Sequence, residues 1–80
     1  MEELYVRLSL SNGENIAGEF EAESITAGIE MVEQSRKTSL VFRGKVHQRC
    51  LCVDSGAVVF FEVGERHETT ELRFEPRAKY

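Results

Sequence analysis

The chain has 80 residues, of which 41% are hydrophobic and 30% are charged, a composition typical of one small globular domain and not of a disordered chain. Its net charge of −4 disfavours, on average, contact with nucleic acid or anionic membranes. The opening residues lack the basic start and apolar stretch of a signal peptide, and no apolar run approaches the length of a membrane span. We therefore predict a cytoplasmic protein with a single domain over residues 1–76 and a tail over residues 77–80 that frays.

The first predicted element is a hairpin formed by residues 4–10 and 16–20. Large apolar side chains alternate with other residues in both segments, which is the period of a half-buried strand. The connection contains an Asn-Gly pair, which fits a two-residue turn, but a three-residue loop with Gly13 in the left-handed conformation keeps the large apolar groups on one face. We expect this second arrangement. Its register pairs Leu8 with Ile16, Val6 with Gly18 and Leu4 with Phe20.

Residues 23–37 fit either a helix or a strand. In a helix, Ser24 caps the first turn, and an inward stripe is formed by Ile25, Ile29 and Val32. In a strand, the apolar residues between positions 25 and 31 alternate equally well. The length of the segment and its Glu, Gln, Arg and Lys content favour the helix. The strand would instead make the whole chain a small all-β barrel.

The second half of the chain predicts four strands. Residues 38–43 form one strand, which bends away at Gly44, and residues 71–75 form the last. Residues 46–53 and 57–63 are expected to pair as a second hairpin around an Asp-Ser-Gly loop. The register of that hairpin pairs Val53 with Ala57 and Leu51 with Val59. The predicted fold class is therefore α+β, an antiparallel sheet with one helix in the order strand, strand, helix and four strands.

The predicted second hairpin is apolar on both faces near its turn. One helix covers only one face of a sheet, so the other face needs the sheet to curl over it or a second chain to cover it. A self-complementary surface closed by twofold symmetry is the simplest such cover, and we expect a homodimer. The expected interface residues are Cys50, Cys52, Val58 and Phe60.

The charges along the chain are unevenly distributed. Residues 1–33 carry eight glutamates and one arginine, residues 34–53 carry five basic residues and no acid, and residues 54–80 carry six acids and four bases. The basic segment could bind nucleic acid or a phosphorylated ligand, or it could pair with acidic strand residues such as Glu19 or form the polar rim of a protein interface. The isoelectric point near 5.1 favours pairing or a rim over nucleic acid. The candidate anion-binding residues are Arg36, Lys37, Arg43, Lys45 and Arg49.

Candidate catalytic and metal-binding groups are few. Cys50, Cys52, His47 and His67 could supply four zinc ligands, but the spacing His-x2-Cys-x-Cys is not a standard zinc motif. On a regular strand both thiols face away from His47, which also removes the base that a cysteine nucleophile needs. We find no paired-carboxylate or glycine-rich phosphate motif. The sequence therefore predicts no enzyme, no metal and no cofactor.

Residues 6–20, with the sequence Val-Arg-Leu-Ser-Leu-Ser-Asn-Gly-Glu-Asn-Ile-Ala-Gly-Glu-Phe, resemble the strand–turn–strand of Sm-like RNA-binding barrels. The resemblance covers fifteen residues and implies no function for this chain, because the leading helix and the second motif of that family are missing. We predict instead a non-enzymatic protein-binding module, a small regulator, adaptor or inhibitor that acts by surface contact. Binding of nucleic acid or a phosphorylated ligand by the basic segment is the alternative.

Overall fold

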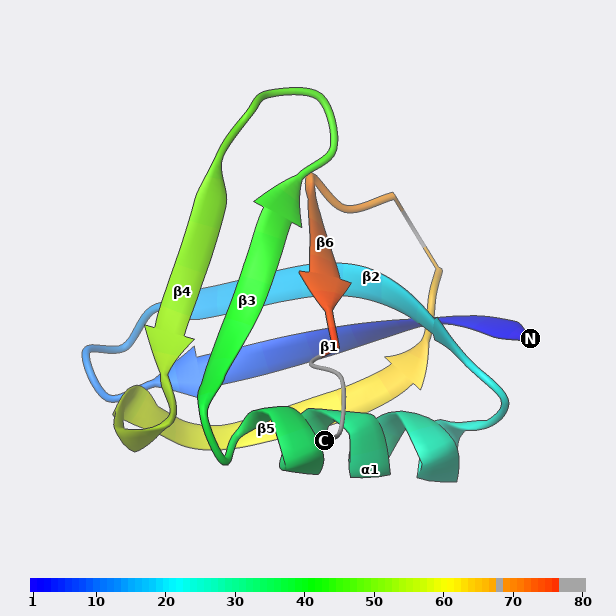
Figure 1. Ribbon diagram of the computed structural model, residues 1–80, viewed down its shortest axis with the longest axis horizontal. Helices are drawn as coiled ribbons and strands as arrows, with labels where there is room; N and C mark the ends of the chain where they lie inside the picture. The colour runs from blue at the N-terminus through cyan, green and yellow to red at the C-terminus, as the bar shows by residue number, and fades with distance from the viewer. Residues whose placement is uncertain (68, 77–80) are drawn as a thin grey trace.

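A computed structural model describes residues 1–67 and 69–76, and in it one six-stranded sheet curls as a half-barrel around a single helix (Figure 1). The elements in chain order are β1 (Glu2–Leu10), β2 (Asn15–Ala22), α1 (Ile25–Ser35), β3 (Ser39–Gly44), β4 (Cys50–Asp54), the 3-10 turn η1 (Ser55–Ala57), β5 (Val58–Glu65) and β6 (Leu72–Glu75). The predicted order of strands and helix is confirmed. The predicted tail over residues 77–80 lies outside the described residues.

The first hairpin forms in the predicted register. β1 pairs antiparallel with β2, with Leu8 opposite Ile16 and Leu4 opposite Phe20. Gly13 has a φ of 88°, the left-handed conformation that a three-residue loop requires. Because of this register, the large apolar residues of β1 and β2 share the face that the core occupies.

The helix is also confirmed, but its buried side differs from the predicted stripe. Ser24 caps α1, since its Oγ accepts a hydrogen bond of 3.1 Å from the N–H of Ala27. Val32 is buried as expected, whereas Ile25 and Ile29 are 38% and 36% exposed. The helix faces the sheet through Gly28, where an added Cβ would lie only 2.8 Å from Cδ1 of Leu4. This close approach rotates the two isoleucines to the flank of the helix.

The predicted second hairpin is wrong. β4 pairs antiparallel with β3, β5 pairs antiparallel with β1, and the strand order is β4-β3-β6-β2-β1-β5. The two strands therefore lie at opposite edges of the sheet. Gly56 does not take the positive φ of Gly13, and the preceding Asp54 caps η1 by accepting a hydrogen bond of 3.1 Å from the Gly56 N–H. The segment that we expected to reverse the chain instead carries it from one edge to the other.

The sheet is mixed and not purely antiparallel, because β6 runs parallel to β2 while it pairs antiparallel with β3. β6 brings Phe74 between the other two core aromatic rings. The ring centroids lie 5.4 Å from Phe20, edge to face, and 5.3 Å from Phe42. The buried core is completed by Leu4, Val6, Leu8, Ala22, Val32, Leu40, Val53, Val58 and Leu72.

No helix in the described part of the chain is long and apolar enough to cross a membrane.

Candidate functional site

The four predicted interface residues do not form one surface. Cys50 and Cys52 are exposed on β4, on the outer face of the sheet, which is the face opposite the core. Phe60 is 56% exposed on β5, at the other edge, and Val58 is buried in the core. The pairing of β4 with β3 separates these residues, so their predicted proximity is wrong.

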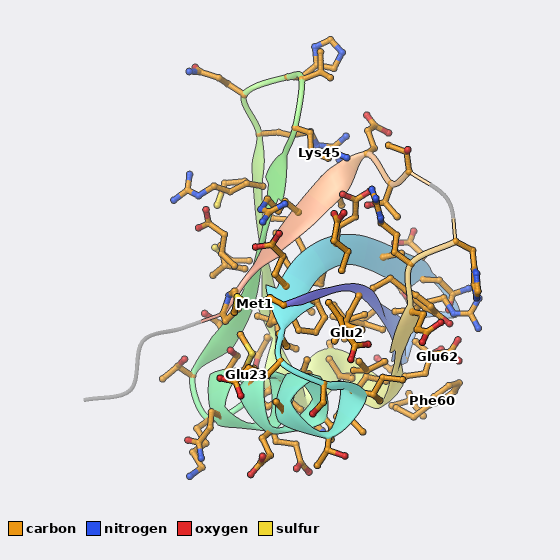
Figure 2. All side chains as sticks on the ribbon, turned by 90° about the vertical axis from the view of Figure 1, so that its right-hand side faces the viewer. Met1, Glu2, Glu23, Lys45, Phe60 and Glu62 are labelled. Atoms are coloured by element: carbon orange, nitrogen blue, oxygen red, sulfur yellow. The ribbon has the colours of Figure 1, made fainter. Side chains whose placement is uncertain are left out.

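A bulge in β5 instead exposes two successive apolar side chains. Ser9 of β1 pairs with Phe60 and the next residue, Leu10, pairs with Val58, which leaves Val59 as the extra residue. Val59 is 64% exposed and Phe60 is 56% exposed. We call this pair the Val59–Phe60 surface, and Figure 2 shows Phe60 at the periphery of the molecule, away from Lys45. Sequence reasoning missed Val59 because alternation places it on the inner face, and only the bulge turns it outward.

Helix α1 runs beside β5 and shields that edge of the sheet (Figure 1). The guanidinium of Arg36 lies 5.6 Å from the centroid of the Phe61 ring. Ile29 and Ile25 precede Arg36 by seven and eleven residues, so they lie on the same flank of the helix. The apolar flank of α1 therefore borders β5.

The free side of β4 has no such cover. β4 is the outermost strand of the sheet, and no other strand in residues 1–67 and 69–76 pairs with it on the side away from β3. The N–H of Gly44 donates a hydrogen bond of 3.0 Å to the carbonyl of Arg49, so these two residues form a hydrogen-bonded pair. Hydrogen-bonded and non-hydrogen-bonded pairs alternate along two antiparallel strands, so the next pair, Arg43 with Cys50, is not hydrogen-bonded. The backbone groups of Cys50, Cys52 and Asp54 consequently point away from β3. We call this free side the β4 edge.

The candidate anion-binding residues are divided between the two ends of β3. Arg36 and Lys37 follow α1 and line a shallow hollow with Ser55, whereas Arg43, Lys45 and Arg49 lie at the far end of the strand. The structure therefore does not gather the five into one anion-binding surface.

The basic residues at the far end of β3 pair with acids, as the pairing interpretation predicts. Nζ of Lys45 lies 3.0 Å from Oε1 of Glu19, and a guanidinium nitrogen of Arg49 lies 3.7 Å from a carboxylate oxygen of Glu71. Nε of Arg43 donates a hydrogen bond of 2.6 Å to Glu75, which raises the pKa of the guanidinium. Lys45 and Arg43 are therefore closely paired, whereas the contact of Arg49 with Glu71 is longer and joins two exposed side chains.

Glu19 is the one buried carboxylate of the outer face among the described residues, with 3% of its surface exposed. It accepts hydrogen bonds from the backbone N–H of Thr70 at 2.8 Å, from Lys45 at 3.0 Å and from Arg66 at 3.4 Å. Burial alone would raise the pKa of Glu19, but these hydrogen bonds outweigh it and lower the pKa from 4.5 to about 2. Glu19 thus fastens the connection between β5 and β6 to β2. The sequence named Glu19 as a possible partner of the basic segment, but its position in an alternating strand suggested an exposed side chain, so its burial was missed.

A small hollow of about 170 Å³ lies beside this carboxylate, lined by Tyr5, Arg7, Arg66, His67 and Thr70. Its two arginines already have acidic partners. Arg7 forms an ion pair with Glu62, and Arg66 pairs with Glu3 at 3.1 Å as well as with Glu19. The hollow therefore has no excess of positive charge to attract an anion.

The histidines and cysteines do not assemble either. His47 lies in the exposed connection between β3 and β4, and His67 lies beyond β5, at the other edge of the sheet. Within residues 1–67 and 69–76, no three His, Cys, Asp or Glu side chains lie close enough together to hold a metal ion.

Comparisons of this chain with protein-family models, with curated proteins and with solved structures found no match.

Proposed function

We propose that the chain is a non-enzymatic, cytoplasmic protein-binding module, a small regulator, adaptor or inhibitor, that contacts its partner through the Val59–Phe60 surface. The observation that carries the proposal is the exposure of two consecutive large apolar side chains on a strand, at 64% and 56%. A bulge that turns both outward forgoes the burial of one of them in the core. Full burial of such a side chain contributes about 1.5–3 kcal/mol, so a partner that covers both gains a binding hot spot.

The surroundings of the surface suit a protein partner. Ser9 lies opposite Phe60 on β1, and the Arg7–Glu62 ion pair lies on the same face one step along the strands. Protein interfaces commonly combine an apolar centre with a polar rim of this kind. A small apolar centre fits a transient contact better than an obligate one.

Affinity purification from the source cells tests the proposal. We expect a stoichiometric partner that is retained by the unmodified chain and lost with Phe60→Ser, with affinity at least about tenfold lower. Val46→Ser is the matched control, because Val46 is also an exposed apolar residue, 83% exposed, on the loop between β3 and β4. A partner retained equally by the Phe60 and Val46 variants would contradict the proposal.

A further inference from the structure

Apart from the charge of Asp54 at its end, the β4 edge lacks the features by which proteins usually protect an exposed strand. Protected edges are very short or carry charged side chains, proline, a bulge or a covering helix. β5 has two of these, the bulge at Val59 and the neighbouring helix α1. β4 has the sequence Cys-Leu-Cys-Val-Asp and pairs with β3 without a register shift. It therefore presents an unobstructed template for another strand.

The backbone of β4 can accept a strand over its whole length. The N–H and C=O groups of Cys50, Cys52 and Asp54 point to the free side, since the intervening Leu51 and Val53 face β3. The thiol side chains of Cys50 and Cys52 are exposed and small, so they do not obstruct the approach of a second backbone. A partner strand can therefore align with all five residues.

The charges at the two ends of β4 select an antiparallel copy of the same strand. Asp54 gives one end a negative charge. Arg49 directly precedes Cys50 and gives the other end a positive charge, because its contact with Glu71 is long, at 3.7 Å, and joins two exposed side chains. Antiparallel pairing of two copies brings each negative end beside the partner's positive end, whereas parallel pairing sets like charges together.

We propose that two copies of this chain associate through their β4 edges, antiparallel about a twofold axis at Cys52. In this register all five residues of each strand are paired, Cys52 faces Cys52 of the partner subunit, and Asp54 faces the partner's Cys50 next to the partner's Arg49. The two six-stranded sheets join into one continuous sheet. The Val59–Phe60 surface lies at the opposite edge and stays free, so the dimer does not depend on the proposed function.

The cysteines provide a direct measure of the register. Residues directly opposite each other in a hydrogen-bonded antiparallel pair have Cα atoms about 5.5 Å apart, which suits a disulfide. Diamide, a thiol-specific oxidant, takes up two electrons and two protons from two thiols, and the thiols form one S–S bond while the N=N bond is reduced to a hydrazine. We expect Cys50→Ser to give a covalent dimer with diamide and Cys52→Ser to give at least about tenfold less.

Cys50 is the matched control for Cys52, because it is also a free and exposed thiol on the same face of the same strand. Equal cross-linking of the two variants, or more with Cys52→Ser, would overturn the proposed pairing. Cross-linking is measured on non-reducing gels and reversed with dithiothreitol, so that only disulfides are counted.

Sedimentation velocity under reducing conditions tests the association without the thiol chemistry. We expect a concentration-dependent dimer for the unmodified chain and for Phe60→Ser, and a monomer for Cys52→Lys, which sets two cations against each other on the axis. Circular dichroism verifies that Cys52→Lys is folded. A monomer at every concentration up to about 1 mM would overturn the proposal. Such a result, together with loss of the protein partner in Phe60→Ser, would leave the proposed function intact.

Discussion

Glu19 is the residue whose environment departs most from that of its neighbours in the sequence. Its carboxylate is buried and holds Lys45, Arg66 and the Thr70 backbone together across three segments of the chain. A buried charge of this kind is stable only while all its partners are in place.

We expect Glu19→Gln to lower the free energy of unfolding by about 2 kcal/mol, because the amide cannot balance the two cations. Urea unfolding followed by circular dichroism measures the change. Glu21→Gln is the control, since Glu21 lies two residues further along β2 with an exposed side chain, and it should change stability by less than about 0.5 kcal/mol. Equal changes in the free energy of unfolding for the two substitutions would show that the hydrogen bonds and ion pairs of Glu19 do not stabilise the fold.

Stability should also depend on pH through Glu19. Its pKa is about 2 in the folded protein, below the ordinary value of 4.5. A carboxyl group whose pKa is lowered by folding stabilises the fold above its unfolded-state pKa, and this contribution is lost as pH falls through the folded-state pKa. Between about pH 5 and pH 2, the unmodified chain should therefore lose about 2–3 kcal/mol more than Glu19→Gln. Urea titrations at several pH values compare the two, and parallel curves would refute the role of Glu19.

At the scale of elements, the sequence predicted what is local and missed what is long-range. The register of the first hairpin and the cap of α1 each depend on a few neighbouring residues, Gly13 and Ser24 among them. The pairing of β4 was missed because both β3 and β5 offer it apolar partners, and the Asp-Ser-Gly connection resembles a hairpin loop. The choice depends on the conformation of Gly56 and on the core, which no local pattern reveals.

The same limit applied to the candidate site. Exposure of Phe60 was predicted, but its grouping with the two cysteines relied on the incorrect hairpin. The bulge at Val59 depends on the pairing of β5 with β1. No local pattern in the sequence around Val59 or Phe60 predicts that these two residues lie at the opposite edge of the sheet from the cysteines.

The packing of the Phe42 ring against β2 depends on Gly18. An added Cβ there would lie 2.6 Å from Cδ2 of the Phe42 ring and 3.0 Å from the backbone nitrogen of Phe74. We expect Gly18→Ala to destabilise the fold by about 2 kcal/mol, because neither the core ring nor the backbone can move freely. Thermal and urea unfolding measure this.

Gly56→Ala is the control for Gly18→Ala. Beyond the two residues next to Gly56 in the chain, the atom nearest to an added Cβ there is Oδ1 of Asp54 at 3.7 Å, an ordinary contact. We expect a change of less than about 0.5 kcal/mol. If Gly18→Ala were equally harmless, the close approach of the Phe42 ring and the Phe74 backbone to Gly18 would be incorrect.

At the scale of the whole molecule, folding brings the acidic and basic segments of the chain together. Lys45 of the basic segment meets Glu19 of the acidic one, and Arg43 meets Glu75 near the end of the described chain. The uneven charge pattern of the sequence therefore becomes a set of short-range pairs. A large single-sign field, which would steer nucleic acid to the surface, does not result.

This pairing of acidic and basic side chains predicts that the basic segment does not bind nucleic acid. We expect single-stranded RNA labelled with a fluorophore to show no change in anisotropy with up to about 10 μM protein at low salt, well above the affinity of specific complexes. Binding that weakens steeply with added salt, and is lost in Arg43→Ala with Arg49→Ala, would instead support nucleic-acid recognition by the basic segment.

The two edges of the half-barrel are separate surfaces, with β4 free to pair on its outer side and β5 at the opposite edge beside α1. Amide hydrogen exchange of β4, followed by NMR at increasing protein concentration, tests this arrangement most directly. We expect the Leu51 and Val53 amides to be protected at all concentrations, and the Cys50, Cys52 and Asp54 amides to exchange rapidly in dilute solution and slowly in concentrated solution. Protection of the Cys52 amide in the dilute monomer would show that another segment of the same chain already covers this edge, and would contradict the account.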